Sequence, residues 1–470
     1  MIRLSVLEEN EVEAIHQASL RILDETGFIL TEPKSRAVLT AAGARIQDSH
    51  VLLPPDLVER CIALAGRKIA IHGRGGAVKT LGGGELYFHN LGGAPQVFDS
   101  ASGTRRLAVI QDVRDATRLL DALENCNTIT PFFTPTDVPG GVMSLAMYRH
   151  ALPYTLKPLQ GPGVQFEAEV LFAVRMAEVI GSPSEVLTLS LSPVSPLSFP
   201  DHEAEAIMEI ARQGIAFAPL PCPTAGTTAP FSIAGAIAQQ NAEILATLVL
   251  AELVHPGLPI IYCGRLAMME PRTGLSVWGG VEMGMASAAT VQIGHRYGLP
   301  VNVYGFSTNA HSLDVQDGFE RALNAAIPAL AGADELSGIG EMEAGVMGSS
   351  AQMVVDNEFA GSIFRIRKGI AVDADSLAVE VVQAVMHSSR NFLGQKHTMK
   401  YLKSGEVFLT KHAERGSWES WESTGRTGIV ARVQAEAERI LREHQVPPLE
   451  DAQEHELDAL MVAAEKELVK

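Results

Sequence analysis

Cysteine is scarce in this sequence, and the four present are far apart: Cys61, Cys126, Cys222 and Cys263. They form no CxxC pair and no Cys/His cluster, which excludes a disulfide framework and a structural zinc site. The first residues, MIRLSVLEENEVEAI, also lack the basic start and the apolar run of a signal peptide. We therefore expect a cytoplasmic protein in a reducing compartment, with no metal bound by this chain.

Basic residues are also few, with 37 Lys and Arg against 55 Asp and Glu, which gives a formal charge of −18. Such a charge does not favour binding to nucleic acid or to an anionic membrane. The longest apolar run, residues 233–254, could span a bilayer by length, but it contains two glutamines, an asparagine and two glutamates. We therefore expect this run to be a buried helix. From the acidic net charge, we expect the ligand to be a small molecule rather than a nucleic acid or a membrane.

A chain of 470 residues with 46% hydrophobic positions can bury a large core. After Asn127, short apolar or β-branched runs alternate with helical stretches at a spacing of roughly 30 residues, as repeated βα units require. Seven or eight such units favour a closed (β/α)8 TIM barrel over an open sheet. The seven runs are 128–133, 155–160, 187–192, 215–221, 259–263, 300–304 and 335–339. The eighth strand stays open: it either precedes Asn127 or follows Gly369.

The rest of the chain divides around this α/β core. Residues 1–126 predict an N-terminal α+β layer, including a hairpin in QVFDSASGTRRLAV, and residues 127–370 the barrel. Residues 371–470 predict a C-terminal helical extension, which covers the barrel exterior or contacts another subunit. We expect a homo-oligomer.

Several segments carry distinctive motifs. The longest is Pro221–Gly264, with its AGTTAP loop, the NAE at Asn241–Glu243 and HPG before the next run. Others are FDSASGTRRLAVIQDV, SPVSPL and the stretch Asp314–Ile370, with ALAGAD, GEMEAG and VVDNEF. Together these segments resemble the trimethylamine methyltransferase family. The resemblance implies a barrel enzyme that moves a methyl group from an amine nitrogen to Co(I) of a corrinoid, that is cobalamin-type, cofactor.

The corrinoid is expected on a partner protein, because this chain has no HxDxxG corrinoid-ligand motif; HSLD at His311 has the wrong spacing. By the same resemblance, members acting on trimethylamine carry pyrrolysine at the position of Ser312. A quaternary amine needs no such electrophile, because its nitrogen is already fully charged. The resemblance therefore implies a quaternary amine substrate, with glycine betaine first and carnitine, proline betaine or γ-butyrobetaine behind it.

Candidate site residues follow from the predicted strand ends, where barrel active sites form. Ser312 and Glu343 are the catalytic candidates; Glu343, like Glu341, could instead form a structural ion pair. Aromatic side chains could cage a cation through cation–π contacts, although each could equally pack in the core. These are Phe133 with Phe132, Tyr262, Trp278, Tyr304 and Phe306.

A betaine carboxylate also needs hydrogen-bond donors, for which the candidates are Gln160, His311, Arg265 and Asn309. Each of them could instead make a structural hydrogen bond. Two alternatives to the corrinoid-dependent methyltransferase stay open: a betaine-binding or regulatory protein without turnover, and a barrel enzyme of another reaction class.

Overall fold

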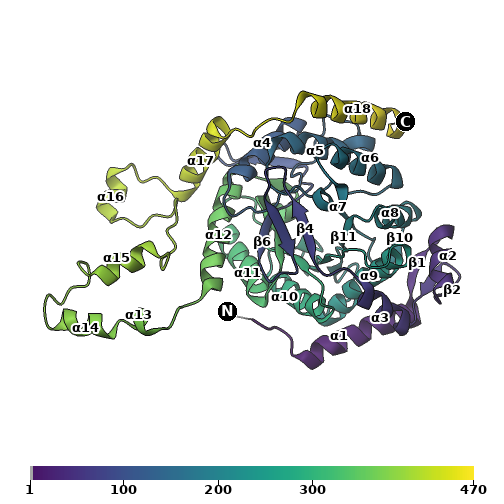
Figure 1. The fold of residues 1–470 in the computed structure, drawn as a ribbon, viewed down its shortest axis with the longest axis horizontal. Helices are drawn as coiled ribbons and strands as arrows, with labels where there is room; N and C mark the ends of the chain where they lie inside the picture. The colour runs from purple at the N-terminus through teal and green to yellow at the C-terminus, as the bar shows by residue number, and fades with distance from the viewer. Residues whose placement is uncertain (1–3, 470) are drawn as a thin grey trace.

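Eight parallel strand segments close into a ring at the centre of the computed structural model, which describes residues 4–469 (Figure 1). Hydrogen-bonded ladders join β11 to β9 and run through β13, β16, β17 and β6. Single parallel bridges complete the circle, from His89 to Thr128, Ile129 to Leu159, residues 163 to 190 and 217 to 260. The named strands are β6 (Tyr87–Asn90), β9 (Thr188–Leu191), β11 (Ala216–Pro219), β13 (Tyr262–Gly264), β16 (Val301–Tyr304) and β17 (Glu335–Ile339).

Each strand segment is followed by a helix, so the fold is the predicted (β/α)8 barrel. The eight helices are α4 (Ile110–Ala122), α5 (Met143–Ala151), α6 (Glu167–Glu178), α8 (Asp201–Arg212), α9 (Ile233–Val254), α10 (Val281–Arg296), α11 (Val315–Ala331) and α12 (Ser350–Lys368). The long apolar helix α9 has the length and composition of a membrane span, but 83% of its most apolar window is buried inside the protein. The prediction that it is a core helix is confirmed.

The barrel begins earlier in the chain than the predicted boundary at residue 127. Its first strand is β6, which pairs with β17 and so resolves the missing eighth strand. The predicted hairpin, β7 (Gln96–Asp99) and β8 (Thr104–Leu107), is present but lies between β6 and α4. This insertion hides the βα spacing of the first unit, which is why the sequence pattern started one strand late.

The N-terminal segment packs against the barrel side at α8 and α9, as the purple ribbon of Figure 1 shows. It contains α1 (Glu9–Arg21), α2 (Pro33–Ala41), α3 (Pro55–Leu64), and β1 (Phe28–Leu30), β2 (Arg45–Gln47) and β3 (His50–Leu52), joined by β10 (Ser198–Phe199). A second hairpin, β4 (Ile69–His72) and β5 (Val78–Leu81), closes the N-terminal end of the barrel. Its Ile69, Ile71 and Leu81 pack in one apolar cluster with inward-facing residues of β11 and β13.

The segments that carried the family resemblance pack against one another. Glu243 of α9 accepts hydrogen bonds from the hydroxyl of Ser195 at 2.8 Å and the backbone N–H of Leu197 at 2.9 Å. Asn241, two positions before it in the NAE motif, donates to Tyr297 and accepts from Tyr262. These motifs therefore hold the loop after β9 and the β13 strand against α9.

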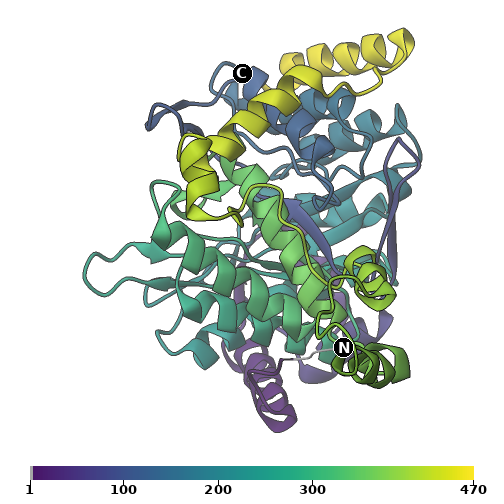
Figure 2. The same ribbon diagram turned by 90° about the vertical axis from the view of Figure 1, so that its left-hand side faces the viewer.

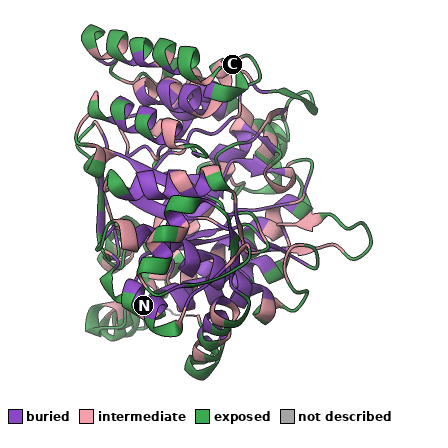
Figure 3. Cartoon of the chain, turned by 90° about the vertical axis from the view of Figure 1, so that its right-hand side faces the viewer, coloured by how far each residue is buried: buried purple, intermediate pink, exposed green. Residues whose placement is uncertain are grey.

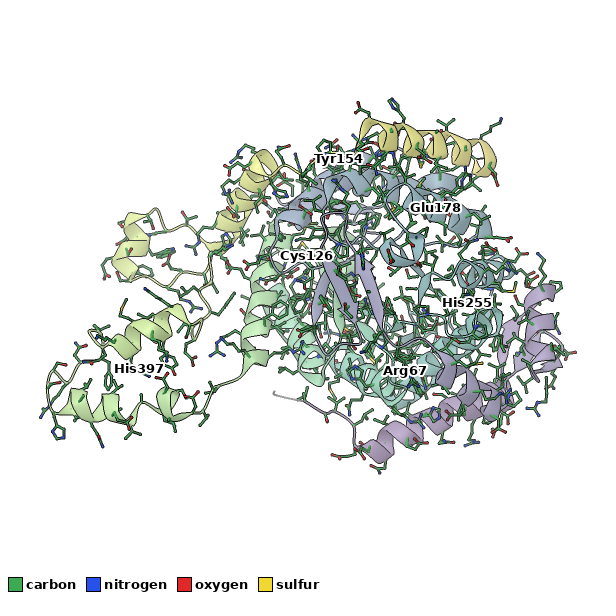
Figure 4. The ribbon with its side chains drawn as sticks, viewed as in Figure 1. Arg67, Cys126, Tyr154, Glu178, His255 and His397 are labelled. Carbon is green, nitrogen blue, oxygen red and sulfur yellow. The ribbon has the colours of Figure 1, made fainter. Side chains whose placement is uncertain are left out.

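Residues 370–428 form an arm that stands off from the barrel before the chain returns in α17 (Ile429–Glu443) and α18 (Asp451–Leu468) (Figures 1 and 2). The arm contains α13 (Ala374–Leu377), α14 (Val379–Met386), α15 (Lys396–Lys403) and α16 (Trp418–Ser423). Within the described chain, Val385 is the one buried side chain of these four helices. His397, labelled in Figure 4, lies on this arm away from the barrel. The side view of Figure 3 contrasts the buried barrel strands with the exposed outer faces of the helices.

Candidate active site

A cavity of about 370 Å³ opens at the C-terminal ends of the barrel strands. Its lining comes from all eight strand segments and the loops that follow them. Residues contributed by successive strands include His89, Thr130, Gln160, Ser190, Ala218, Cys263, Asn302, Tyr304 and Ser337. The C-terminal end of a (β/α)8 barrel is where enzymes of this fold carry their active sites, so this cavity is the candidate site.

The inner end of the site is a closed polar network. Lys79 of β5 enters from the opposite end of the barrel and forms a fully buried ion pair with Glu335, at 2.7 Å. The Glu335 carboxylate also accepts from Asn302 at 2.7 Å and, at 3.3 Å, from Gln160. Burial raises the pKa of Glu335, but the charge of Lys79 and the hydrogen bonds from Lys79 and Asn302 outweigh it and hold the pKa below its usual value. The network therefore carries a satisfied charge pair and fixes the Gln160 and Asn302 side chains in the cavity wall.

His89 shares this network in the neutral state. Its Nε2 lies 3.0 Å from the Asn302 amide and its Nδ1 3.3 Å from the Thr130 hydroxyl. Burial lowers the pKa of His89 to about 4, against the opposing effect of Glu335. At neutral pH it is an uncharged hydrogen-bonding group rather than a cation.

Arg265 puts a positive charge in the cavity wall. It follows β13, is 7% exposed, and its guanidinium donates to the Asn302 side chain at 2.6 Å and to two backbone carbonyls at 3.2 Å. Its guanidinium carbon lies 5.3 Å from the centre of the Tyr304 ring. No carboxylate of residues 4–469 forms an ion pair with it. A buried guanidinium without an acidic partner is suited to an anionic group of a ligand.

Tyr304 is the one Phe, Tyr or Trp of the described chain that lines the cavity. Its hydroxyl donates to the buried carboxylate of Glu341, which also accepts from the backbone N–H of Thr308. Trp278 packs edge-on against the Tyr304 ring, with centroids 5.4 Å apart, but does not itself line the cavity. One aromatic wall is therefore present where the sequence predicted a cage.

The other predicted aromatic residues are not part of the cavity lining, so the structure does not bring them together as an aromatic cage. Tyr262 is fully buried among the helices, where its hydroxyl donates to Asn241 at 2.7 Å. Phe306 packs edge-on against Phe88, and Phe133 packs against Phe132. The alternative reading, core packing, holds for these three side chains.

Ser312, Glu343 and His311 lie on the loops above the strands, outside the cavity lining. The exposed Ser312 hydroxyl donates to Asp314, the N-cap of α11, at 2.8 Å. Glu343 forms an ion pair with Arg105 of β8 at 3.0 Å and faces His311 at 3.3 Å. These three residues therefore lie outside the cavity. Asn309 is not part of the lining either, and its side chain accepts a hydrogen bond from the backbone N–H of Trp278.

Glu203, which the sequence did not single out, lines the same cavity. It lies in the first turn of α8, is 7% exposed, and its Oε2 atom is buried without a hydrogen-bond partner among the described residues. Burial raises the pKa of its carboxyl to about 7. Apolar side chains of Met143, Met147 and Val164 line the cavity as well. The site thus combines an unpartnered acid, an unpaired guanidinium and apolar walls.

Within residues 4–469, no group of three or more His, Cys, Asp or Glu side chains is placed to hold a metal ion. Cys263, which does line the cavity, is a poor ligand and nucleophile, because burial raises the pKa of its thiol to about 12. The site offers charge, hydrogen bonds and exclusion of water rather than a reactive side chain.

Comparison with protein families gives one match over almost the whole chain. The family model described as trimethylamine methyltransferase (MTTB) matches residues 1–468. The trimethylamine methyltransferase MttB of Desulfitobacterium hafniense is 28% identical over 455 residues, which is 95% of this chain and 91% of that protein. A glycine betaine methyltransferase of the same species is 27% identical over 477 residues, which is 99% of this chain and 98% of that protein.

Solved structures give the same architecture. The monomethylamine methyltransferase MtmB of Methanosarcina barkeri superimposes with a TM-score of 0.51 over 95% of this chain and 96% of its own, at 13% identity. A complex of MtmB with hydroxylamine gives a TM-score of 0.50. At this identity the likeness supports the barrel fold alone.

Proposed function

The chain belongs to the trimethylamine methyltransferase family, and from that premise we propose that it moves a methyl group from a quaternary amine to Co(I) of a corrinoid on a separate protein. It is a methyltransferase by family. The donor that fits the cavity best is a betaine, with glycine betaine first. The observation that carries this choice is Arg265, a buried guanidinium in the cavity wall that has no acidic partner in the described chain.

The residue at position 312 supports a quaternary donor. Family resemblance puts pyrrolysine at this position in members that act on trimethylamine, whereas this chain has Ser312. The Ser312 hydroxyl is bonded to Asp314 and lies outside the cavity lining, so it offers a substrate no electrophile. A quaternary nitrogen needs none, since it leaves with the electron pair of the broken C–N bond as a neutral tertiary amine.

The protein's own contribution is then to bind, orient and dry the substrate. Arg265 holds the carboxylate, and its bond to Asn302 keeps the guanidinium in place. The apolar wall of Met143, Met147 and Val164 excludes water from the methyl groups. Positioning and desolvation of this kind supply much of the barrier reduction in a displacement that needs no acid or base. The methyl acceptor is the reduced corrinoid of the partner, which supplies the nucleophile.

The test uses the purified chain, a reduced corrinoid protein and a panel of amines. With glycine betaine the Co(I) absorption should decay and dimethylglycine should form; trimethylamine should give no reaction. Binding of a betaine without loss of Co(I) would instead support a binding or regulatory protein. Absence of both binding and transfer for every quaternary amine would favour a barrel enzyme of another class.

The exposed arm supports the homo-oligomer. Its apolar side chains face solvent in the single chain, with Leu393 79%, Leu409 78% and Trp418 62% exposed. Residues 370–428 contain seven acidic and seven basic residues, so the charge of −18 lies on the rest of the chain. A neutral apolar arm can lie on an acidic second copy without repulsion. Sedimentation should show an oligomer that Leu393→Asp with Leu409→Asp dissociates; an unchanged mass would contradict it.

A further inference from the structure

Glu203 differs from the other buried acids around the barrel in having no partner. Glu335 is paired with Lys79, Glu341 accepts from Tyr304 and Thr308, and Glu243 accepts from Ser195 and Leu197. The Glu203 side chain forms no hydrogen bond or ion pair within the described chain, its Oε2 atom is buried, and the residue lines the cavity. A buried carboxylate without a partner is costly, so its place in a ligand cavity calls for an explanation.

A trimethylammonium group is a matching partner for such a carboxylate. It carries a permanent positive charge spread over its methyl groups and has no N–H to donate. It therefore gains from a nearby negative charge in a dry site without needing the close, directed contact of a hydrogen bond. The apolar Met143, Met147 and Val164 side chains in the same lining suit its methyl groups.

The positive charge in the cavity wall, that of Arg265, comes from a part of the barrel close to Glu203. Arg265 follows β13, whereas Glu203 begins the helix that follows β9, and β11 lies between these two strands. We propose that Glu203 is the counter-charge for the ammonium group of the substrate and that, together with Arg265, it selects a zwitterion. This assignment rests on the proposed function, since it takes a betaine as the donor. It makes Glu203 a specificity-determining residue in place of the aromatic cage.

Three ligands of nearly the same shape allow the contributions of the two charges to binding to be measured separately. Glycine betaine carries both, choline keeps the trimethylammonium but lacks the carboxylate, and 3,3-dimethylbutyrate keeps the carboxylate but has an uncharged tert-butyl group. Binding of each to the full chain is measured by calorimetry at pH 8, without a corrinoid protein. Glu203→Gln removes the charge at constant shape. Glu209→Gln, on the same helix but outside the cavity lining, is the matched control.

Glu203→Gln should raise the Kd of glycine betaine and of choline at least about tenfold, as expected on removing one partner of a buried charge pair. The Kd of 3,3-dimethylbutyrate should stay the same or fall. Arg265→Gln should show the reverse pattern, weakening glycine betaine and 3,3-dimethylbutyrate but not choline. Glu209→Gln should leave all three unchanged.

An equal loss of all three ligands in Glu203→Gln, or no loss of any, would overturn the proposal. Glu203→Asp, which keeps the charge, should recover part of the choline affinity, whereas a purely structural role would not give this recovery. Because no methyl transfer is measured, failure of the corrinoid reaction would leave this result intact. A correct charge pattern without methyl transfer would overturn the proposed reaction alone.

Discussion

The guanidinium of Arg265 lies over the ring of Tyr304, with its central carbon 5.3 Å from the ring centre. Arg265 follows β13, Tyr304 ends the neighbouring strand β16, and both residues line the cavity. Tyr304 is itself anchored by its hydrogen bond to Glu341. The single aromatic wall of the site is therefore occupied by a protein cation, and in this account it orients the group that binds the substrate carboxylate.

Replacing Tyr304 with leucine should weaken glycine betaine binding about 2- to 30-fold, because a cation–π contact contributes about 0.5–2 kcal/mol. Choline, which has no carboxylate, should bind almost as before. Calorimetry of both ligands makes the comparison. Tyr304→Phe keeps the ring and removes the hydroxyl, so a loss of equal size in this variant would assign the effect to the hydrogen bond with Glu341 instead.

Binding of a cationic ligand should depend on pH through Glu203. Burial raises the pKa of this carboxyl to about 7, and a cation binds to its ionised form. Affinity should therefore level off about one unit above pH 7 and fall as the pH drops below 7, approaching tenfold per unit. Choline binding between pH 5.5 and 8.5 measures this profile.

The other titratable groups of the cavity lie outside this window. Burial lowers the pKa of His89 to about 4 and raises that of Cys263 to about 12. Burial and the neighbouring Glu341 raise the pKa of Tyr304 well above its usual value. The helices packed on α8 contribute Glu169, Glu243 and Lys34, and Lys34 forms an ion pair with Glu205 of α8 itself. Since these remain in Glu203→Gln, a pH dependence that persists in that variant would assign the profile to them.

Gly163 offers a steric test of the cavity. A Cβ added there meets no atom within 4 Å, and the residue lines the site. Gly163→Leu should therefore fold normally but fill part of the cavity, raising the KM for glycine betaine several-fold and more so for carnitine. Gly140→Leu, at an equally open position outside the lining, is the control. Unchanged KM values for both substrates would show that the donor binds elsewhere.

The buried pair of Lys79 and Glu335 should matter for folding more than for chemistry. Lys79→Met leaves the Glu335 carboxylate buried and uncompensated, and should lower the free energy of unfolding by about 3–5 kcal/mol. Denaturant unfolding at pH 7 measures this. Adding Glu335→Gln should recover part of the loss, whereas Lys34→Met on the surface should change little. Full stability of the single variant would show that Glu335 is protonated or otherwise partnered.

Most of the barrel was predictable because its strands are buried on both sides. Runs such as IIYC and VNVY are apolar without alternation, as parallel strands in this environment are. The first strand, YFHN in β6, was not assigned to the barrel because it carries polar residues into the cavity and because the β7–β8 hairpin separates it from its helix. The first cause lies in the site itself, because His89 and Asn90 line the cavity, whereas the second lies in the loop that follows the strand.

The site was predicted in part, and strand alternation explains the errors. Successive side chains on a strand point to opposite faces, so Ile261, Cys263 and Arg265 line the cavity whereas Tyr262 points to the helices. The same alternation puts Asn302 and Tyr304 inside. Choosing residues by aromatic type rather than by this parity selected Tyr262 wrongly. Glu203 carries no comparable signal, since a buried acid on an amphipathic helix is visible only after packing.

The central claim is that a permanently charged amine gives up its methyl group in this cavity without an electrophilic side chain. The most direct measurement is a single turnover with carbon-13-methyl glycine betaine, excess chain and a limiting reduced corrinoid protein. We predict one labelled methyl group on the corrinoid and one dimethylglycine for each Co(I) consumed, with no transfer from trimethylamine. Transfer from trimethylamine at an equal rate, or tight betaine binding with no labelled corrinoid, would contradict the account.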